Sequence, residues 1–336
     1  MTSDAGTSRG AAQPEGEAGA EIKAVPARHP GRWIATAIVL YVVVIFIHGV
    51  ATNPAFNWSV VTKNLFDGFV LKGVVRTLWL TFLSMVVGVL LGTVLAVMRL
   101  SPVKIISGVA WVYIWFFRGT PVFVQLLVWG SISAIFGANV AIQIPWPFGI
   151  VLTHVPTTHL IPTFVAAVLG LGLNEAAYMA EIVRAGIVSV GEGQAEAAAS
   201  LGMTRLQTLR LVVLPQAMRV IVPPTGNETI GMLKTTSLAG IALAYPELTY
   251  VVTQVFAVNF LIIPWLMIAV VWYLILTSIL TFGQFYVERY YARGSTRALP
   301  PTPLQRFRAL FTRNLTTVHS PEGKAPLEPP PLSEAR

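Results

Sequence analysis

The stretch that decides the fold is Ala195–Ala217, which reads AEAAASLGMTRLQTLRLVVLPQA. Alanine, glutamate and leucine are good helix formers, and Gly202 after them is typical of a helix C-terminus. Thr204, with Gln207 three residues later, predicts a capping box at the start of a second helix. We expect Pro215 to end this second helix and to fit the first turn of the next one. The stretch therefore predicts a polar helical hairpin between more apolar segments.

The rest of the chain is too apolar for a soluble protein. Of its 336 residues, 54% are hydrophobic and 11% are charged, whereas soluble proteins carry about 25% charged residues. The net charge of +8 indicates basic cytoplasmic loops rather than nucleic-acid binding. The sequence has no cysteine, which excludes a disulfide framework, thiol chemistry and cysteine-based zinc sites. No metal site is expected, because the loop 136–161 offers only His154 and His159 as ligands.

Six apolar stretches are candidates to cross a bilayer as helices, which takes about 20 residues each. They are residues 33–50, 74–98, 109–135, 162–187, 216–243 and 261–287. In the second stretch, Gly88 and Gly92 have the spacing of small residues that lets helices pack closely. The fifth is the least regular, because Pro223, Pro224 and several polar side chains interrupt it. The predicted fold class is an all-α integral membrane protein with about six transmembrane helices.

The basic residues predict the orientation of these helices. With the amino terminus inside, the inner segments 1–32, 99–108, 184–214 and 288–336 hold 17 Lys or Arg residues. The outer segments 51–76, 136–161 and 244–260 hold 3. The polar hairpin and both termini are therefore expected on the cytoplasmic side of a cell membrane.

The regions outside the apolar stretches have their own signatures. Residues 1–32 lack apolar periodicity and are predicted to be a disordered cytoplasmic tail. The segment 51–73 interleaves aromatic with charged side chains and is expected to be an extracytoplasmic amphipathic helix. The cytoplasmic tail 288–336 is basic and rich in proline; within it, 304–315 is either a helix on the inner leaflet or disordered. The outer loop 136–161 is expected to be a surface loop that faces a binding protein.

Charged residues within the predicted spans cost at least about 2.5 kcal/mol each in hydrocarbon, so they must face protein or water. They are Arg118, Glu175, Glu181, Glu228 and Lys234, with Arg184 and Arg219 near the inner boundary. Two sets of polar residues share a helix face by their spacing: Tyr178, Glu181 and Arg184, and Asn227, Gly231 and Lys234. Two interpretations stay open: ion pairs that hold the bundle together, or the polar lining of a translocation path.

The hairpin has the spacing of a known element. Glu196-Ala197-Ala198, Gly202 and Leu214-Pro215 resemble the EAA loop of ABC importer permeases, with Val212 where isoleucine is usual. In that family the loop, here 192–215, is the cytoplasmic element that docks in a groove of the ATPase subunit. The resemblance implies an ATPase-coupling role for six residues: Glu196, Ala197, Ala198, Gly202, Leu214 and Pro215.

Two further segments narrow the resemblance to the polar amino-acid permeases. Arg118-Gly119-Thr120-Pro121 is similar to that family's RGTP segment, and 177–187 is similar to the segment ahead of its EAA loop. The match covers 74–287 and resembles the histidine/glutamine/glutamate-type permeases. It implies the MetI-like fold of five core helices that type I ABC importers share. Residues 33–50 would then be an added N-terminal transmembrane helix.

The resemblance implies a permease subunit that imports polar or charged amino acids and carries no cofactor. Separate ATPase subunits would bind ATP and Mg²⁺, a second permease chain, the same or different, would complete the path, and an extracytoplasmic binding protein would deliver the amino acid. The candidate substrate path consists of Arg118, Thr120, Gln125, Tyr178, Glu181, Asn227 and Lys234. Arg118 is expected to face that path, where its planar fork suits a carboxylate. Pro121 and the Pro223-Pro224 pair are expected to bend their helices.

An enzyme is not expected, because a phosphate-binding loop needs Gly-Lys followed by Ser or Thr. The sequence has one Gly-Lys pair, Gly323-Lys324, and alanine follows it. An ion-coupled secondary amino-acid transporter would usually have about twice as many spans, often as two related halves. A channel would need a repeated selectivity element. An ABC permease for another small polar solute stays open, as does the identity of the amino acid.

Overall fold

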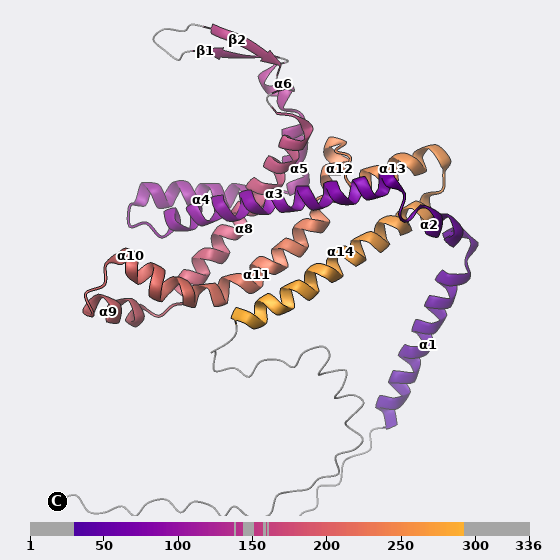
Figure 1. The fold of residues 1–336 in the computed structure, drawn as a ribbon, viewed down its shortest axis with the longest axis horizontal. Coiled ribbons are helices and arrows are strands. Elements are labelled where there is room, and N and C mark those ends of the chain that lie inside the picture. The colour runs from indigo at the N-terminus through magenta and orange to yellow at the C-terminus, as the bar shows by residue number, and fades with distance from the viewer. Residues whose placement is uncertain (1–29, 138, 144–150, 157–158, 160, 292–336) are drawn as a thin grey trace, which may run out of the picture. The chain divides into compact units, whose positions relative to one another are not determined.

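The computed structural model describes residues 30–137, 139–143, 151–156, 159 and 161–291 (Figure 1). The predicted tails 1–32 and 288–336 lie outside these residues, except for 30–32 and 288–291. The chain divides into two units, residues 1–56 and 57–336.

The first unit contains one long helix, α1 (Pro30–Thr52), followed by a single 3-10 turn, η1 (Pro54–Phe56). The part Trp33–Thr52 carries no charged side chain, and its large apolar side chains are exposed on every side. A helix that is apolar all round suits a lipid environment. A helix of membrane-spanning length thus occurs where the sequence predicts the added helix 33–50.

The predicted amphipathic segment 51–73 is not one helix: it begins at the end of α1 and in η1, and its residues after 56 fall in two elements of the second unit. α2 (Trp58–Asn64) is a short helix. α3 (Gly68–Arg99) is capped by Asp67, whose carboxylate accepts a hydrogen bond from the Phe69 N–H at 3.2 Å. The second span therefore starts before residue 74, because the cap lets the helix begin ahead of the apolar stretch.

The third predicted span, 109–135, is wrong as a single helix. α4 (Lys104–Gly119) and α5 (Val122–Gly130) meet at an angle of 97°. Pro121 lacks a backbone donor and disfavours helical geometry in the residue before it. Thr120 is accordingly extended, with φ −115° and ψ 141°. The bend expected at Pro121 is confirmed.

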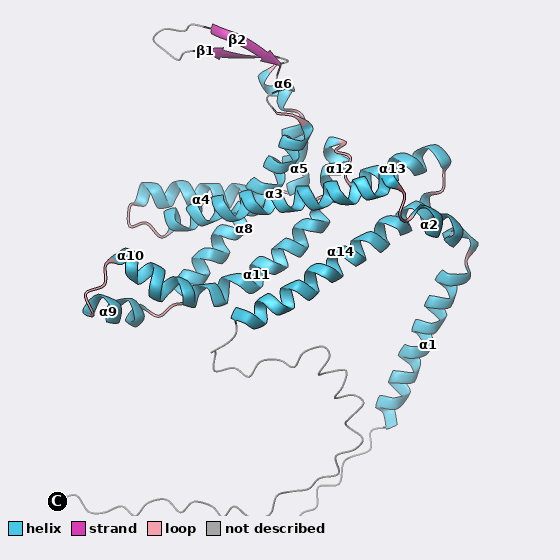
Figure 2. Ribbon diagram, in the orientation of Figure 1, coloured by secondary structure: helices cyan, strands magenta, loops and turns pink. Residues whose placement is uncertain are grey.

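The segment after α5 contains a short helix and two strands. α6 (Ile132–Phe136) leads into β1 (Asn139–Gln143) and β2 (Val151–Pro156). The strands pair antiparallel, with Val140 opposite Val155. The other described elements are helices (Figure 2). The all-α prediction therefore holds apart from this hairpin in the loop that the sequence predicts.

α8 (Thr163–Val188) packs closely against α3 (Figure 1). Glycines remove the side chains that would keep the two helices apart. A Cβ atom on Gly88 would lie 2.6 Å from the Glu175 Cγ, and one on Gly92 would lie 2.6 Å from the Met179 Cβ. The order of these two pairs shows that α3 and α8 run in the same direction. The close packing expected at Gly88 and Gly92 is confirmed.

The polar hairpin predicted from the sequence is formed by α9 (Glu192–Ser200) and α10 (Arg205–Thr208). Three residues, 189–191, separate the last residue of α8 from the first residue of α9, so the hairpin follows the span directly. The two short helices contact each other, and α9 also contacts the turn that follows α10.

The helix that starts at α10 does not end at Pro215, so that prediction is wrong. A π-helical turn, η2 (Leu209–Val213), joins α10 directly to α11 (Leu214–Thr235). The first N–H of α11 donates to the Leu209 carbonyl, five residues back. This wider turn relieves the clash that a proline ring makes with the preceding turn. The expected place of Pro215 in the first turn of the next helix is confirmed.

α11 runs without interruption through Pro223 and Pro224, so the helix is not broken there. The neighbouring helix α14 contacts this region, because the Gln284 Nε2 donates a hydrogen bond to the Pro223 carbonyl at 3.2 Å. The break comes later, between α12 (Ser237–Leu243) and α13 (Leu248–Asn259). The direction of α13 differs by 48° from that of the helical stretch Arg205–Leu243, whose last element is α12.

The described helices agree with the six predicted spans. Four are long and apolar enough to cross a membrane as single helices: α1, α3, α8 and α14 (Ile262–Tyr291). The two bent pairs raise the number to six if each pair is one span. One apolar core includes Leu80, Leu126 and Leu171, and a second includes Val70, Leu248 and Ile268.

Candidate functional site

The end of α9 is fixed by its own backbone. Gly202 adopts a left-handed conformation with φ +78°, which residues with a Cβ atom rarely adopt. Its N–H donates to the Ala199 carbonyl at 2.9 Å, and the Met203 N–H donates to the Ala198 carbonyl at 3.1 Å. These two bonds form a Schellman motif. The prediction that Gly202 stops the helix is confirmed.

The start of α10 has the capping box predicted at Thr204 and Gln207. The Gln207 N–H donates to the Thr204 Oγ1 at 3.3 Å, and the Thr204 N–H donates to the Gln207 Oε1 at 2.8 Å. Backbone groups at both helix ends are thus satisfied within the hairpin. The hairpin therefore has a defined shape before any partner binds.

The hairpin presents an apolar surface. Leu201, Leu206 and Leu211 are 83%, 73% and 64% exposed, and exposed apolar patches mark interaction sites. Five of the six predicted coupling residues are also exposed: Glu196, Ala197, Gly202, Leu214 and Pro215. The sixth, Ala198, is buried and belongs to the packing of the hairpin. The exposed residues are available to another protein chain.

The break between α4 and α5 is held by buried amide groups. The Nε2 of Gln125, a residue that is 7% exposed, donates to the Thr120 Oγ1 at 2.7 Å and to the Phe117 carbonyl at 3.1 Å. Asn174 of α8 donates to the same Phe117 carbonyl at 2.8 Å and to the Gln125 Oε1 at 3.2 Å. Thr120 and Gln125 are both in the predicted substrate path, and in this structure their side chains stabilise the break between α4 and α5. Sequence reasoning missed Asn174, although an amide beside Glu175 in an apolar span is a signal that could have found it.

Arg118 lies in the last turn of α4, next to this break. Its guanidinium carbon is 5.2 Å from the centroid of the Tyr178 ring, within the range of a cation–π interaction. Further along α8, Glu181 and Arg184 form an ion pair at 2.7 Å. The sequence predicts that one face of α8 carries Tyr178, Glu181 and Arg184. Two of these residues, Glu181 and Arg184, form an ion pair with each other, and the ring of the third, Tyr178, is contacted by Arg118 of α4.

Two further acidic side chains are linked to Arg118, one directly and one through the other. Glu175 of α8 interacts electrostatically with Glu228 of α11, and Glu228 interacts with Arg118. Glu175 is 5% exposed, and Glu228 is partly buried. We call Arg118, Glu175 and Glu228 the charged cluster. In this cluster, Glu228 of α11 interacts with Glu175 of α8 and with Arg118 of α4.

The last two residues of the predicted path lie on α11. The Asn227 Oδ1 accepts a hydrogen bond from the Gln284 Nε2 at 3.0 Å. Lys234 is exposed, and within the described ranges it forms no ion pair. The structure therefore joins Asn227 to α14 and places no acidic partner on Lys234 among the residues that it describes.

A second buried carboxylate, Glu247, precedes α13 and has no exposed surface. It accepts hydrogen bonds from the Thr249 and Tyr250 N–H groups, each at 2.8 Å. The Tyr273 hydroxyl at 3.1 Å and the Thr77 hydroxyl at 3.4 Å complete its partners. Glu247 thus caps α13 and joins it to α3 and α14. Sequence reasoning missed this residue, because two of its partners lie in distant parts of the chain.

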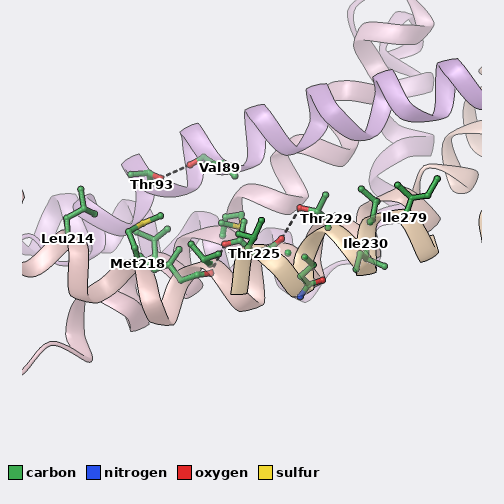
Figure 3. Close-up of a pocket in the computed structure, with 17 residues that line it drawn as sticks. Val89, Thr93, Leu214, Met218, Thr225, Thr229, Ile230 and Ile279 are labelled. Carbon is green, nitrogen blue, oxygen red and sulfur yellow. Dashed lines mark hydrogen bonds between the residues drawn. The ribbon is translucent and has the colours of Figure 1, made fainter. Parts of the chain in front are cut away.

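An apolar cavity of about 610 Å³ lies between α3, α8, α11 and α14 (Figure 3). Its hydroxyl groups are directed back onto their own helices: Thr93 donates to the Val89 carbonyl at 2.7 Å and Thr229 to the Thr225 carbonyl at 2.9 Å. The residues that line it include no charged side chain. The cavity therefore does not suit a charged solute, in contrast to the charged cluster.

Long apolar helices, two broken spans and an exposed polar hairpin define a multi-pass membrane permease. Residues 88–290 match the family described as binding-protein-dependent transport system inner membrane component. That range covers more than half of the chain, and the chain belongs to this family.

Relatives agree with this assignment. The chain is 46% identical over 280 residues to the arginine transport system permease protein ArgU of Corynebacterium glutamicum, covering 83% of this chain and 85% of that one. It is 32% identical over 234 residues to the glutamine transport system permease protein GlnP of Escherichia coli strain K12, covering 70% and 97%.

Two solved structures share the fold. A crystal structure of an amino acid ABC transporter with histidines matches at 35% identity and a TM-score of 0.56, covering 68% of this chain and 97% of that one. An inward-facing structure of the MetNI methionine ABC transporter matches at 21% identity and a TM-score of 0.50, covering 67% and 97%. The second match shows the fold alone, and it supports the predicted MetI-like bundle.

Family membership settles several predictions. The chain is an inner-membrane transport component of an ABC importer rather than an enzyme, and permeases of this family carry no cofactor. An ATPase and a binding protein belong to such a transporter complex. The alternative of an ion-coupled secondary transporter is therefore wrong.

Proposed function

We propose that this chain is the permease of an importer for cationic amino acids and that the loop 192–215 couples it to an ATPase subunit. The arginine permease relative, at 46% identity, supports the substrate class. The relatives named for glutamine and cystine have lower identity and handle uncharged side chains. The observation on this chain that supports a cationic substrate is the charged cluster, in which Glu228 interacts with both Arg118 and Glu175, so that acidic groups outnumber basic ones.

The charged cluster is complementary to the charges of a cationic amino acid. Arg118 would bind the α-carboxylate, because its planar guanidinium can donate two parallel hydrogen bonds. Glu175 and Glu228 would offset the positive charges of the α-ammonium group and the side chain. With all groups ionised, the cluster has a net charge of −1 and the amino acid has a net charge of +1. The two net charges would cancel when the amino acid binds, which matters in a region of low dielectric.

The exposed surface of the hairpin supports the coupling role. Leu201, Leu206 and Leu211 would enter a groove of the ATPase, while Glu196 would lie at the edge of the contact. ATP binding would bring two ATPase subunits together and draw two hairpins with them. The π-helical turn between α10 and α11 makes the hairpin continuous with a span, which would carry that movement into the bundle.

The remaining partners follow from the same model of transport. A second permease chain, identical or different, would enclose the path, because one bundle of this size forms only one wall. An extracytoplasmic binding protein would deliver the amino acid at the face that bears β1 and β2. The distribution of Lys and Arg residues supports cytoplasmic termini.

Uptake by cells that contain the complete transporter tests the substrate class. Labelled arginine uptake should be inhibited by lysine and ornithine and should be unaffected by glutamate. It should also stop when the ATPase subunit is inactivated. Uptake of an anionic or uncharged solute in preference to arginine would show that the permease serves another small polar solute.

Replacement of Arg118 tests its role. Hydrogen bonds to charged groups contribute about 1.5–3 kcal/mol, so Arg118→Ala should weaken the apparent affinity for arginine at least tenfold. Arg118→Lys keeps the charge but loses the planar fork, so its affinity should be intermediate. Normal affinity and rate in Arg118→Ala would remove Arg118 from the path.

A further inference from the structure

Glu175 is a buried acidic residue with an unsatisfied oxygen. It is 5% exposed, and its Oε1 atom has no hydrogen-bond partner among the described residues. Ser84 of α3 is fully buried, and its Oγ atom also lacks a partner there. Buried polar groups are nearly always hydrogen-bonded, so each exception requires an explanation.

The packing around Glu175 makes room for its side chain. α3 has glycine at position 88, where a Cβ atom would lie 2.6 Å from the Glu175 Cγ and 2.9 Å from its Cβ. Ser84 lies one helical turn before Gly88, so both face α8. The interface between α3 and α8 thus accommodates a glutamate without supplying the donors that would satisfy it.

Glu247 shows how this fold treats a carboxylate whose role is structural. Glu247 is at least as buried as Glu175, yet two backbone N–H groups and two hydroxyls donate to it. Glu175 has no such set of donors. A structural role therefore explains Glu247 and leaves Glu175 unexplained.

The electrostatic surroundings of Glu175 favour a cation. Its neighbour Glu228 is also acidic, and Arg118 interacts with Glu228. The basic residue of α8 itself, Arg184, is already paired with Glu181. A positively charged group with several donors would satisfy both the charge and the open hydrogen-bonding positions, and a guanidinium has five N–H donors.

We infer that Glu175 is a specificity-determining residue that accepts the cationic side-chain group of the transported amino acid, with the Ser84 hydroxyl as an additional acceptor. This inference rests on the proposed function. Asn174, the residue before Glu175, bonds to the carbonyl of Phe117 in α4. Movement of α4 and α5 during transport would therefore open the route by which a substrate reaches Glu175.

Direct binding of amino acids to the purified permease–ATPase complex tests the inference. The binding protein is left out, because it has a selectivity of its own. L-Arginine is compared with L-citrulline, which has nearly the same shape but an uncharged end. The wild-type complex should prefer arginine, and Glu175→Gln should lower that preference at least tenfold by weakening arginine binding. Glu247→Gln is the matched control: it should lower thermal stability and keep the wild-type preference.

A second variant tests the same contact without removing the charge. Glu175→Asp shortens the side chain by one methylene, so it should shift preference from arginine toward homoarginine, whose side chain is one methylene longer. An unchanged preference in both Glu175 variants, or an equal loss in Glu247→Gln, would overturn the inference and leave the proposed function standing. A wild-type complex that binds citrulline as well as arginine would overturn the cationic substrate class itself.

Discussion

Single residues near the polar hairpin act through their backbone geometry. Gly202 is the clearest case, because it forms the turn between α9 and α10 with a φ of +78°, a value that favours glycine. Its signal in the sequence is local: a glycine follows a run of helix formers, and a capping box follows the glycine. Local signals of this kind predict helix ends well, because the partners lie within five residues of one another.

Gly202→Ala should distort the hairpin. A left-handed conformation costs a residue with a Cβ atom roughly 1–2 kcal/mol, which would reduce the population of the docking shape by about tenfold. The expected result is weaker copurification of the ATPase and less substrate-stimulated ATP hydrolysis, with normal insertion of the permease.

Gly193→Ala is the control for this variant. Gly193 lies inside α9, and an added Cβ atom there would have nothing within 4 Å. Alanine is a better helix former than glycine, so coupling should be unchanged. Equal effects of the two substitutions on ATP hydrolysis would contradict the importance of the left-handed turn.

Residues that join distant segments have no comparable signal in the sequence. Glu247 and Thr77 are 170 positions apart, yet they share a hydrogen bond. Asn174 and Phe117 are 57 positions apart. Spacing within one helix predicts neither contact, which is why both Glu247 and Asn174 are absent from the sequence-based candidates.

At the scale of elements, the two proline-containing regions behave differently. Pro121 breaks its span, because Thr120 before it is extended and the buried amides of Gln125 and Asn174 stabilise the break. Pro223 and Pro224 leave α11 continuous, with Gln284 of the adjacent helix as a donor to the Pro223 carbonyl. A proline therefore does not by itself decide whether a helix breaks: the span breaks where the residue before Pro121 is extended, and α11 continues through Pro223 and Pro224.

The contact between α3 and α8 is the element-level feature that should be most sensitive to added volume. Gly92→Ala would place a Cβ atom 2.6 Å from the Met179 Cβ and 2.9 Å from the Ala176 carbonyl oxygen. Overpacking of this kind costs about 1–3 kcal/mol. The thermal midpoint of the detergent-solubilised protein should therefore fall.

The matched control for that contact is Gly231→Ala in α11. A Cβ atom at Gly231 would have nothing within 4 Å, and the substitution should be neutral or slightly stabilising. A drop in the thermal midpoint for Gly231→Ala as large as that for Gly92→Ala would mean that the interface between α3 and α8 is not what limits stability.

At the scale of the whole molecule, the open prediction is orientation. Family membership establishes a multi-pass inner-membrane protein, and the positive-inside rule predicts cytoplasmic termini and a cytoplasmic hairpin. The natural absence of cysteine makes the chain suitable for labelling at single introduced thiols.

Thr62→Cys on α2 and Ser200→Cys on α9 test the orientation. Both side chains are exposed in the structure. A membrane-impermeant maleimide is applied to cells whose outer layers let it pass and whose inner membrane is intact. It should label Thr62→Cys and leave Ser200→Cys unlabelled. Inverted vesicles should give the opposite pattern, and labelling of Ser200→Cys from outside would refute the docking role of the hairpin.

The sequence by itself determined the membrane class, the six apolar stretches, the hairpin caps and the bend at Pro121. These properties depend on composition, on periodicity and on neighbours within a few residues, all of which a linear chain displays. Only the tertiary structure decided that the helix continues past Pro215, that α8 is the helix that packs against Gly88 and Gly92, and that Glu247 is satisfied while Glu175 is not. Those outcomes depend on groups that meet across helices, and the free energy of a buried polar group is set by which partners reach it in space.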